Sequence, residues 1–276
     1  MLTPAVEALI ALALEEDLGR GDVTSEAIFG ATESSSAKIV AKEPLTVCGL
    51  EVVAAVFARV DRETRFSARV ADGDVMTGKR DVVCVVEGRT RALLSAERTA
   101  LNFLQRMSGV ATLTARFVAA VEGTRARVCD TRKTAPGWRA LDKLAVRAGG
   151  GANHRADLAA GVLIKDNHVA AAGGVKAAVE RARARAPHSL RIEVEVTELA
   201  QIEEALVAGA EVILLDNFDP PKVKLAVDQI AGRALIEVSG GINLDTIGAF
   251  AAAGPDRISV GALTHSARAV DLSLEF

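Results

Sequence analysis

The run Val212-Ile213-Leu214-Leu215-Asp216 places four apolar residues directly before a carboxylate. Such a short apolar run is typical of a strand buried on both faces, and a helical pattern follows it. Five other short, mainly apolar runs likewise end before a polar residue or a glycine turn: Ala126–Cys129, Gly161–Ile164, Arg191–Val194, Ala234–Val238 and Arg257–Val260. The first run is followed by Asp130-Thr131-Arg132-Lys133, and the others are followed directly by Lys165, Glu195, Asp216, Ser239 and Gly261. Counted from Arg132, these positions lie 33, 30, 21, 23 and 22 residues apart. Each step has room for one loop, one helix and one strand, so the repeat predicts βα units.

The βα series predicts the fold of the second part of the chain. Right-handed crossovers place the carboxyl ends of all the strands on one face. Six units predict an α/β barrel of about six to seven strands, with an active site at that face. A doubly wound open sheet is the rival, but no G-x-G-x-x-G motif follows the first strand.

Residues 20–110 have a different pattern, with short β-rich pieces separated by turns and interrupted by helical stretches. The expected strands are Ala37–Ala41, Thr64–Val70 and Val82–Val86, and the expected helices are Leu50–Val60 and a stretch from Ser95 onward. This pattern predicts an α+β domain with a small, mostly antiparallel sheet, and the family resemblance described below implies that it is an α/β sandwich. We therefore expect an N-terminal domain at 1–110 and a barrel domain at 111–276, and the last residues could return to the N-terminal domain.

Composition excludes several classes of protein. The chain has 276 residues, 50% hydrophobic and 25% charged, with a formal net charge of −3, as in ordinary globular proteins. This charge gives no reason to expect nucleic acid as a partner, and 3% aromatic residues supply no base-stacking surface. The three cysteines are far apart and form no CxxC pair, which argues against a disulfide framework or a cysteine zinc site and favours the reducing cytoplasm.

The apolar N-terminus is interpreted as an amphipathic helix rather than a targeting segment. It lacks a basic start and carries Glu7 within the apolar stretch, unlike a signal peptide. Thr3 is placed to cap the helix, Pro4 stands in the first turn and Gly19 follows the end. No run of 18 apolar residues occurs, so we expect no membrane span.

Cations concentrate around the first strand ends of the barrel domain, in a chain that is acidic overall. They are Arg132, Lys133, Arg139, Lys143, Arg147, Arg155 and Lys165, with His154 and His168 beside them. A solvated basic face is one interpretation, but the nearby glycine turn at 149–151 favours a site where loops approach an anion. Because removing a carboxylate from water costs several kcal/mol, a dicarboxylate would need several of these cations.

Two glycine-containing turns follow the last two strands. They are Ser239-Gly240-Gly241 and Val260-Gly261-Ala262, and each joins a strand to a helix. Backbone N–H groups can approach an anion there, and the loops after the last strands of a βα barrel often bind phosphate. Ordinary strand-to-helix turns are the alternative. His265 could reach the same phosphate or be an exposed surface histidine.

Glu195 and Asp216 are candidates for a metal site. They could also be paired acid and base, or structural partners of neighbouring cations. With oxygen ligands and a phosphate nearby, Mg²⁺ is the favoured metal, held partly through the phosphates of the substrate. Glu193 faces the same way as Glu195, because the two are two residues apart in one strand, and it could point into a polar interior or toward cations.

Several long motifs, in a fixed order along the chain, resemble those of a known protein family. The motifs are Glu16–Thr24, Glu97–Asn102, Asp130–Gly137, Gly149–Arg155, Leu163–His168, Leu214–Asn217, Ser239–Gly241 and Val260–His265. Together they resemble quinolinate phosphoribosyltransferase, also called carboxylating nicotinate-nucleotide pyrophosphorylase, over nearly the whole chain. The resemblance implies an enzyme, a decarboxylating pentosyltransferase of NAD biosynthesis. It would convert quinolinate and phosphoribosyl pyrophosphate to nicotinate mononucleotide, pyrophosphate and CO₂.

The resemblance also implies roles for residues. Arg98, Arg132, His154, Arg155 and Lys165 would hold the two carboxylates of quinolinate, with Thr131 as a further substrate contact. Lys133 would contact phosphoribosyl pyrophosphate, Glu195 and Asp216 would manage Mg²⁺ and the ribose hydroxyls, and Ser239–Gly241, Val260–Ala262 and His265 would hold the 5′-phosphate. Lys133, Lys165, Glu195 and Asp216 are the expected catalytic groups. A homodimer or higher even oligomer would donate Arg98 across the interface.

Three alternatives stay open at this point. A paralogous phosphoribosyltransferase or pyrophosphorylase could use another acceptor. A lyase could form a Schiff base on Lys165, which lies at a strand end. A binding protein without activity could sense a phosphorylated anion.

Overall fold

The computed structural model describes residues 2–276, which form two compact units. Unit 1 comprises the chain up to Ala115, together with Thr134–Gly150 and Thr264–Phe276. Unit 2 comprises Arg116–Lys133 and Gly151–Leu263. The helix α4 (Thr90–Ala119) runs without a break through the expected boundary at 110–111. The two units are therefore interleaved along the chain, and a linear division into 1–110 and 111–276 stays a prediction.

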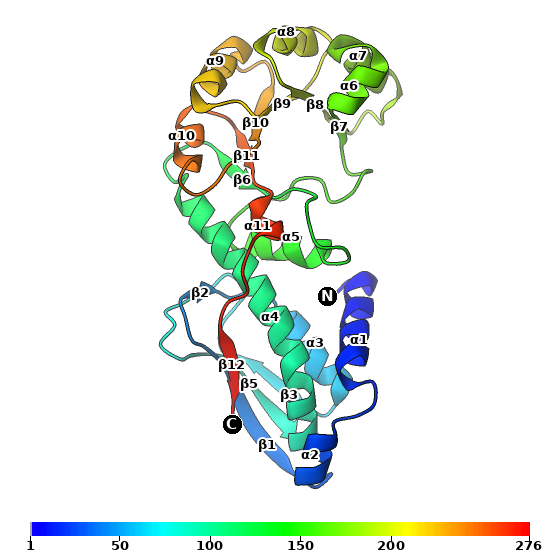
Figure 1. Cartoon of the computed structure of the whole chain (residues 1–276), viewed down its shortest axis with the longest axis vertical. Helices are drawn as coiled ribbons and strands as arrows, with labels where there is room; N and C mark the ends of the chain where they lie inside the picture. Colours follow the sequence, from blue (N-terminus) through cyan, green and yellow to red (C-terminus); the bar gives the residue numbers. More distant parts are fainter. Residues whose placement is uncertain (1) are drawn as a thin grey trace. The chain divides into compact units, whose positions relative to one another are not determined.

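Unit 1 contains an antiparallel sheet in the strand order β12-β1-β5-β3 (Figure 1). Its strands are β1 (Ser34–Ala41), β3 (Arg65–Ala68), β5 (Asp81–Arg89) and β12 (Leu272–Glu275), and a second small sheet pairs β2 (Leu45–Thr46) with β4 (Val75–Met76). The helices are α1 (Pro4–Leu18), α2 (Val23–Ile28), α3 (Leu50–Val60), most of α4, and α5 (Arg139–Ala148), and α11 (Ala262–His265) begins in unit 2 and ends in unit 1. Because β12 pairs with β1, the end of the chain contributes an edge strand to this sheet.

Local sequence explains the helices of unit 1. The Thr3 hydroxyl accepts a hydrogen bond from the Val6 N–H at 3.4 Å, and Pro4 occupies the first position of α1, as expected. The α3 helix has the bounds that the sequence predicts, and it buries Val52, Val56 and other residues of one face. The expectation of a small, mostly antiparallel sheet is confirmed by the strand pairing.

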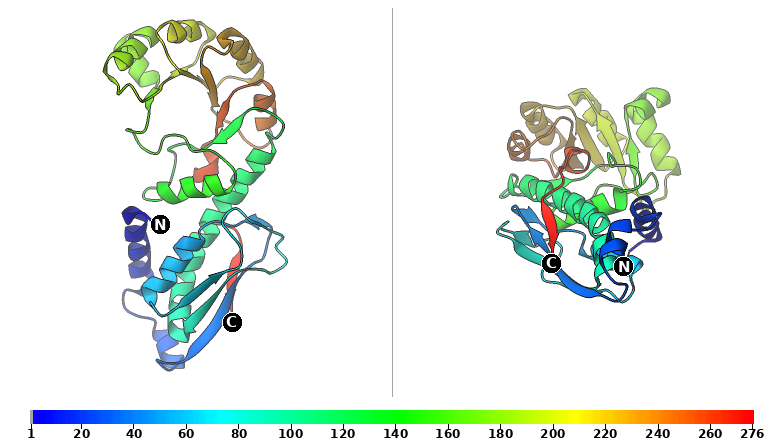
Figure 2. Two further views of the ribbon diagram at one scale, coloured as in Figure 1. Left: turned by 180° about the vertical axis from the view of Figure 1, so that it is seen from behind. Right: turned by 60° about the horizontal axis from the view of Figure 1, so that its bottom comes forward.

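Unit 2 is built from βα repeats around a six-stranded parallel sheet in the order β6-β11-β10-β9-β8-β7. The strands are β6 (Arg127–Cys129), β7 (Val162–Ile164), β8 (Ile192–Val196), β9 (Val212–Asp216), β10 (Leu235–Ser239) and β11 (Arg257–Ser259). The helices are α6 (Asp166–Ala172), α7 (Val175–Arg185), α8 (Leu199–Val207), α9 (Pro220–Ile230) and α10 (Ile247–Ala252). Figures 1 and 2 show the sheet curving, with α7 to α10 along its outer face. The α/β barrel architecture is thus confirmed with six strands.

The barrel sheet ends at β6 and β7, which do not pair with each other. The edge of β6 is instead occupied by Ala152, which forms an isolated parallel bridge with Cys129. The Ala152 N–H donates to the Val128 carbonyl at 2.8 Å, and the Asp130 N–H donates to the Ala152 carbonyl at 3.1 Å. This loop segment satisfies the backbone groups that a seventh strand would otherwise pair.

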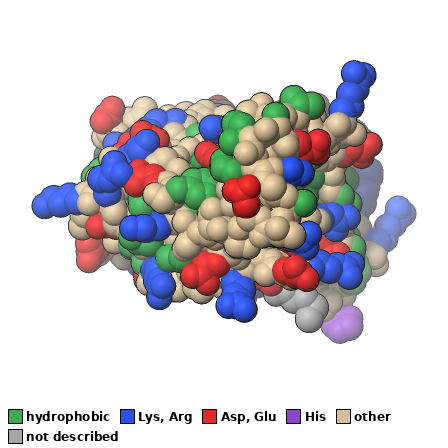
Figure 3. All heavy atoms as spheres, turned by 90° about the horizontal axis from the view of Figure 1, so that it is seen from below, with side chains coloured by type: hydrophobic (Ala, Val, Ile, Leu, Met, Phe, Trp, Pro, Cys, Tyr) green, Lys and Arg blue, Asp and Glu red, His purple; other side chains and the backbone are tan. Residues whose placement is uncertain are grey.

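The molecular surface carries mixed charge on the face drawn in Figure 3, where acidic and basic side chains alternate. Within residues 2–276, no helix combines the length and the apolar character needed to cross a lipid bilayer. Cys48, Cys84 and Cys129 are free and buried. Burial raises the pKa of both Cys84 and Cys129 to about 12, so their thiols stay protonated.

A test of packing in unit 1 uses Gly109, a glycine within α4. A Cβ at this position would lie 2.0 Å from the Arg268 carbonyl oxygen, so Gly109→Ala should lower the free energy of unfolding by about 1–3 kcal/mol through overpacking. Gly248→Ala in α10 is the matched control, because its Cβ would meet only the Ala120 carbonyl at 3.8 Å. The control should be neutral or stabilising by about 0.5–1 kcal/mol. Urea titration of both variants measures the difference, and equal stabilities would contradict the packing assignment.

Candidate functional site

The carboxyl ends of the unit 2 strands bring four predicted catalytic residues into one electrostatic cluster. Glu195 lies in β8 and Asp216 ends β9. Lys133 follows β6 and Lys165 follows β7. Burial raises the pKa of Glu195, and the nearby Asp216 carboxylate raises it further, whereas Lys165 opposes the rise. Burial also raises the pKa of Asp216, against the opposing effect of Lys165 and Lys133. The four charged groups therefore lie close enough to affect one another. This agrees with the expectation that the carboxyl ends of the parallel strands meet at one face of the barrel.

The donor set of this cluster suits a hard divalent cation. Carboxylate oxygens are the ligands that Mg²⁺ prefers, and it usually takes one or two carboxylates together with substrate phosphates. The raised pKa values of Glu195 and Asp216 mean that the nearby lysines do not fully offset the cost of burying the two negative charges. A bound divalent cation would offset the remainder. The residues therefore fit the expected Mg²⁺, whose presence stays a prediction.

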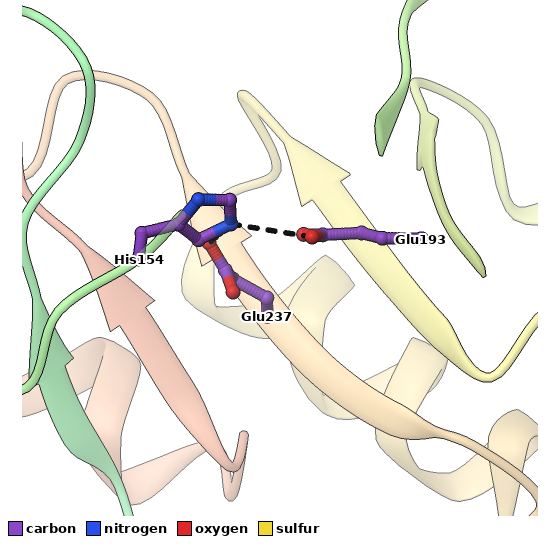
Figure 4. Close-up of side chains that lie close together, drawn as sticks. All are labelled: His154, Glu193 and Glu237. Carbon is purple, nitrogen blue, oxygen red and sulfur yellow. Dashed lines mark hydrogen bonds and ion pairs between the residues drawn. The ribbon is translucent and has the colours of Figure 1, made fainter. Parts of the chain in front are cut away.

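His154 lies deeper, between two carboxylates from different strands (Figure 4). Its Nε2 atom is 3.2 Å from Glu193 Oε2 on β8 and 3.4 Å from Glu237 Oε1 on β10. The possible ligand atoms of the three residues lie within 4.8 Å of one another. Glu237 is 2% exposed, and it accepts a hydrogen bond from the Ser259 hydroxyl on β11. Burial and the nearby Glu193 carboxylate raise the pKa of Glu237 well above its usual range.

The segment that carries His154 is held by Asp130, which is fully buried at the end of β6. The Asp130 carboxylate accepts a hydrogen bond from the His154 backbone N–H at 2.8 Å. With the Ala152 bridge to β6, this bond places the chain from Ala152 to Arg155 beside the interior of the sheet. The glycine turn at 149–151 thus precedes a segment fixed by backbone contacts rather than a free loop.

Arg132 and Arg155 form a pair of like charges at the same site. The nearby Arg132 lowers the pKa of Arg155, although burial is the larger cause. Arg155 Nη1 donates to the Gly161 carbonyl at 3.0 Å, but the buried Nε atoms of both arginines have no hydrogen-bond partner. A buried guanidinium donor without an acceptor is costly, so these two groups are suited to an anion that supplies one.

A pocket of about 470 Å³ adjoins this cluster within unit 2. His154, Arg155, Glu193 and Glu237 line it together with residues at the amino ends of the strands: Val162, Arg191, Val212, Leu235 and Arg257. Its volume lies within the ordinary range for small-molecule sites, about 300–1,000 Å³.

The two glycine turns are each tied by a backbone hydrogen bond to the end of another strand. Gly240 has a φ of 106°, and a Cβ there would lie 2.2 Å from Asn217 Oδ1, so the position requires glycine. The Asn217 N–H donates to the Ser239 carbonyl at 2.9 Å, which ties this turn to the end of β9. In the second turn, the Val260 N–H donates to the Cys129 carbonyl at 2.9 Å, and Ala262 begins α11. The phosphate role of both turns stays a prediction.

Three further predicted residues are Arg98, His265 and Thr131. Arg98 and His265 belong to unit 1, so their predicted roles stay predictions. Arg98 lines a pocket of about 260 Å³ in unit 1 beside Trp138, and the His265 Nδ1 lies 2.6 Å from the Ser266 hydroxyl. The Thr131 hydroxyl accepts a hydrogen bond from the Lys133 N–H at 3.0 Å, so this threonine shapes the turn that presents Lys133.

The sequence interpretation missed Asp130, Glu237 and Ser259 as site residues. Asp130 stands inside a quoted motif, but its buried role depends on the bridge between Ala152 and β6. Glu237 precedes Ser239 by two positions, as Glu193 precedes Glu195, so strand periodicity could have placed it on the interior face. For Glu193, the open option of a polar interior agrees with its contact to His154.

Comparison with known proteins decides the family. The C-terminal domain of quinolinate phosphoribosyl transferase matches residues 110–275, and the N-terminal domain of the same family matches residues 22–108. The chain belongs to the quinolinate phosphoribosyltransferase family. The resemblance stated from the motifs is thereby confirmed, and so are membership of an enzyme family and the mixed α/β fold of this chain.

Similar proteins match over nearly their full length. The carboxylating nicotinate-nucleotide pyrophosphorylase of Mycobacterium leprae is 43% identical over 277 residues, covering 98% of this chain and 97% of that protein. A probable enzyme of the same name from Bacillus subtilis is 43% identical over 260 residues, covering 94% and 89%. The crystal structure of NadC from Streptococcus pyogenes superposes with a TM-score of 0.96 at 43% identity, covering 100% of this chain and 98% of that one.

The raised pKa of Asp216 predicts how the stability of an Asp216→Asn variant depends on pH. The ionised Asp216 carboxylate is less favourable in the folded than in the unfolded state. It therefore lowers the free energy of unfolding at pH values above its folded pKa, and this destabilisation vanishes below the unfolded-state pKa of about 3.9. The variant should therefore be more stable than the native protein at pH 7, and the gain should shrink as the pH falls toward about 4. Thermal unfolding at both pH values measures this, and a gain that grows on acidification would contradict it.

Proposed function

We propose that this protein transfers the phosphoribosyl group of phosphoribosyl pyrophosphate to quinolinate with loss of CO₂, yielding nicotinate mononucleotide and pyrophosphate. The observation that carries the proposal is the convergence of two buried, unpartnered arginine donors with a lysine–carboxylate cluster, in a chain matched along both domains of this family. Such a site offers cations to a dicarboxylate and oxygen ligands to the metal of a phosphorylated sugar.

Quinolinate recognition is assigned to the cations that line the interior of unit 2. The Nε groups of Arg132 and Arg155 lack acceptors, and a substrate carboxylate would supply them. His154 lies beside Arg155 in the chain, and Lys165 adds a charge at the end of β7. Several cations are needed because two carboxylates leave water together, and each desolvation costs several kcal/mol.

Phosphoribosyl pyrophosphate is assigned to the ends of the strands. Lys133 would contact the pyrophosphate, and Glu195 and Asp216 would hold Mg²⁺ and orient the ribose hydroxyls. The turns Ser239–Gly241 and Val260–Ala262 would direct backbone N–H groups to the 5′-phosphate, with His265 as a further contact. When bound, Mg²⁺ would supply charge neutralisation for the departing pyrophosphate.

The mechanism follows from how these side chains hold the reactants. Lys133 stabilises negative charge that accumulates on the leaving pyrophosphate, while Asp216 and Glu195 stabilise positive charge that develops on the ribose carbon. Arg132, Arg155 and Lys165 grip the carboxylates, so the pyridine nitrogen is positioned to attack. Ribosylation makes that nitrogen cationic. The cationic nitrogen then stabilises the electron pair that stays on the neighbouring ring carbon when its carboxylate departs as CO₂, and that carbon takes up a proton from solvent to give the mononucleotide.

The assembly and location of the enzyme are further parts of the proposal. A homodimer or higher even oligomer would let Arg98 of one subunit complete the site of the other, as expected from the family resemblance. We place the enzyme in the cytoplasm, where three buried free thiols are compatible with a reducing environment. No nucleic acid partner is proposed, since the chain has a net charge of −3.

The deciding experiment incubates the purified protein with quinolinate, phosphoribosyl pyrophosphate and Mg²⁺, and follows the mononucleotide, pyrophosphate and CO₂. All three products should appear in equal amounts. Turnover only with another aromatic acid would instead identify a paralogue. Borohydride trapping of a carbonyl substrate on Lys165 would identify a lyase, and binding without any turnover would identify a sensor.

Arg155→Ala should raise the quinolinate KM by about 10–100-fold, because it removes a charge-assisted contact of about 1.5–3 kcal/mol. Arg185→Ala, in the last turn of α7 on the outside of unit 2, is the matched control and should leave the KM unchanged. Steady-state kinetics on both folded variants measures the effect. Unchanged kinetics in a folded Arg155→Ala variant would remove this residue from the site.

Mixed dimers test whether Arg98 is shared between subunits. Arg98→Ala and Lys165→Ala homodimers should each be inactive, whereas a hybrid dimer should regain about a quarter to a half of native activity, because one of its two sites retains both residues. Subunit exchange is verified by native mass spectrometry before the assay. Complete exchange without recovered activity would show that each site uses its own Arg98.

A further inference from the structure

His154 contacts two buried acids, Glu193 and Glu237, to which the proposed reaction assigns no role. Its imidazole Nε2 lies 3.2 Å from the Glu193 carboxylate and 3.4 Å from the Glu237 carboxylate. Figure 4 shows the ring between the two acids, which come from β8 and β10. Since β9 lies between these strands in the sheet, the acids converge across the interior face rather than along one strand.

Two buried carboxylates so close together require compensation, because each loses its hydration. Glu237 receives a hydrogen bond from the Ser259 hydroxyl and the charge of Arg257, both on β11. Glu193 lies in the field of Arg155, and its buried Oε1 has no hydrogen-bond partner. The His154 Nε2 atom lies within reach of both acids, so the ring links the two carboxylates across the interior of the sheet.

This contact fixes a segment that the proposed site depends on. The backbone of His154 is held by the Asp130 carboxylate at 2.8 Å, and its ring is held by Glu193 and Glu237. Arg155 follows directly, with a buried Nε directed to no acceptor. When both the backbone and the ring of one residue are fixed, the start of the next side chain is fixed as well, and its guanidinium is pre-organised for a ligand.

We propose that Glu237 is a positioning residue for dicarboxylate recognition, acting through the His154 ring to hold the His154–Arg155 pair in its binding arrangement. The inference rests on the proposed function, and it assigns to a buried acid on β10 a role in the affinity for quinolinate. In this proposal Glu237 acts through the His154 ring rather than by direct contact with either substrate. Its effect should therefore fall on the quinolinate KM and spare the phosphoribosyl pyrophosphate KM.

A divalent metal between the same three side chains is the competing interpretation, because their ligand atoms lie within 4.8 Å of one another. Two observations favour the positioning role. The Ser259 hydroxyl already hydrogen-bonds to Glu237, and Arg257 and Arg155 place positive charge beside the two acids. Additional positive charge of two units would be repelled by these arginines.

The test is Glu237→Gln, which keeps the side-chain shape and removes the charge. The quinolinate KM should rise about tenfold or more, since small misplacement of a binding group can cost up to about a hundredfold. The phosphoribosyl pyrophosphate KM should change less than about twofold. Glu237→Asp should recover part of the quinolinate affinity, because it restores the charge. Glu180→Gln is the matched control, an exposed acid on α7 that pairs with Lys176, and its kinetics should equal those of the native enzyme.

Three results would overturn the inference. The first is an unchanged quinolinate KM in a folded Glu237→Gln variant. The second is an equal rise of both KM values, which would indicate a general structural role. The third is one equivalent of divalent metal in the native protein, measured by elemental analysis and lost in Glu237→Gln.

A second variant covers the case in which Glu237→Gln does not fold. Ser259→Ala removes only the hydroxyl that donates to Glu237. It should raise the quinolinate KM by about threefold or more, because it removes one hydrogen bond to the Glu237 carboxylate, and an unchanged KM would overturn the inference. Failure of the proposed function is distinguishable, since the native protein would then show no quinolinate turnover at all.

Discussion

Charge compensation inside the parallel sheet of unit 2 is the constraint on which the rest of the site depends. Parallel sheets covered by helices usually have apolar interiors, yet Glu193, Glu195, Asp216 and Glu237 all lie on these strands. The free-energy cost of removing each carboxylate from water has to be offset by a hydrogen bond or a nearby cation. The arrangement of Lys133, Lys165, Arg132, Arg155 and His154 follows from that requirement.

Strand periodicity sorts these charges into two levels. Glu195 and Asp216 stand at or near the carboxyl ends, where Lys133 and Lys165 act on them. Glu193 and Glu237 lie closer to the amino ends, where His154 contacts both. At the outer level the pKa values of Glu195 and Asp216 are raised, which a metal ion would relieve. At the inner level, burial and Glu193 raise the pKa of Glu237 to about 7, and His154, Ser259 and Arg257 offset part of this rise. The proposed division of labour between sugar phosphate and dicarboxylate follows these two levels.

The open edge of the barrel at β6 also contributes to charge compensation in the interior, because the segment that pairs with it carries His154 and Arg155. A seventh strand on β6 would satisfy its backbone but would present only alternate side chains to the interior. Of the residues that the structure describes, Ala152 alone pairs with the backbone of β6 at that edge. His154 and Arg155 follow Ala152 closely in the chain, and the His154 N–H is held by the Asp130 carboxylate. Buried Asp130 is the group that joins this backbone arrangement to the charged interior.

The sequence by itself determined the βα repeats of unit 2, the α3 helix at Leu50–Val60, the capped first helix and the family. These features depend on local periodicity, capping residues or contiguous motifs, which are visible along the chain. Only the tertiary structure decided that Glu237 faces His154, that Ala152 pairs with β6, and that Thr134–Gly150 belongs with unit 1. Periodicity fixes which face of a strand a side chain occupies, but its partner across the sheet depends on strand order and register, which long-range packing sets.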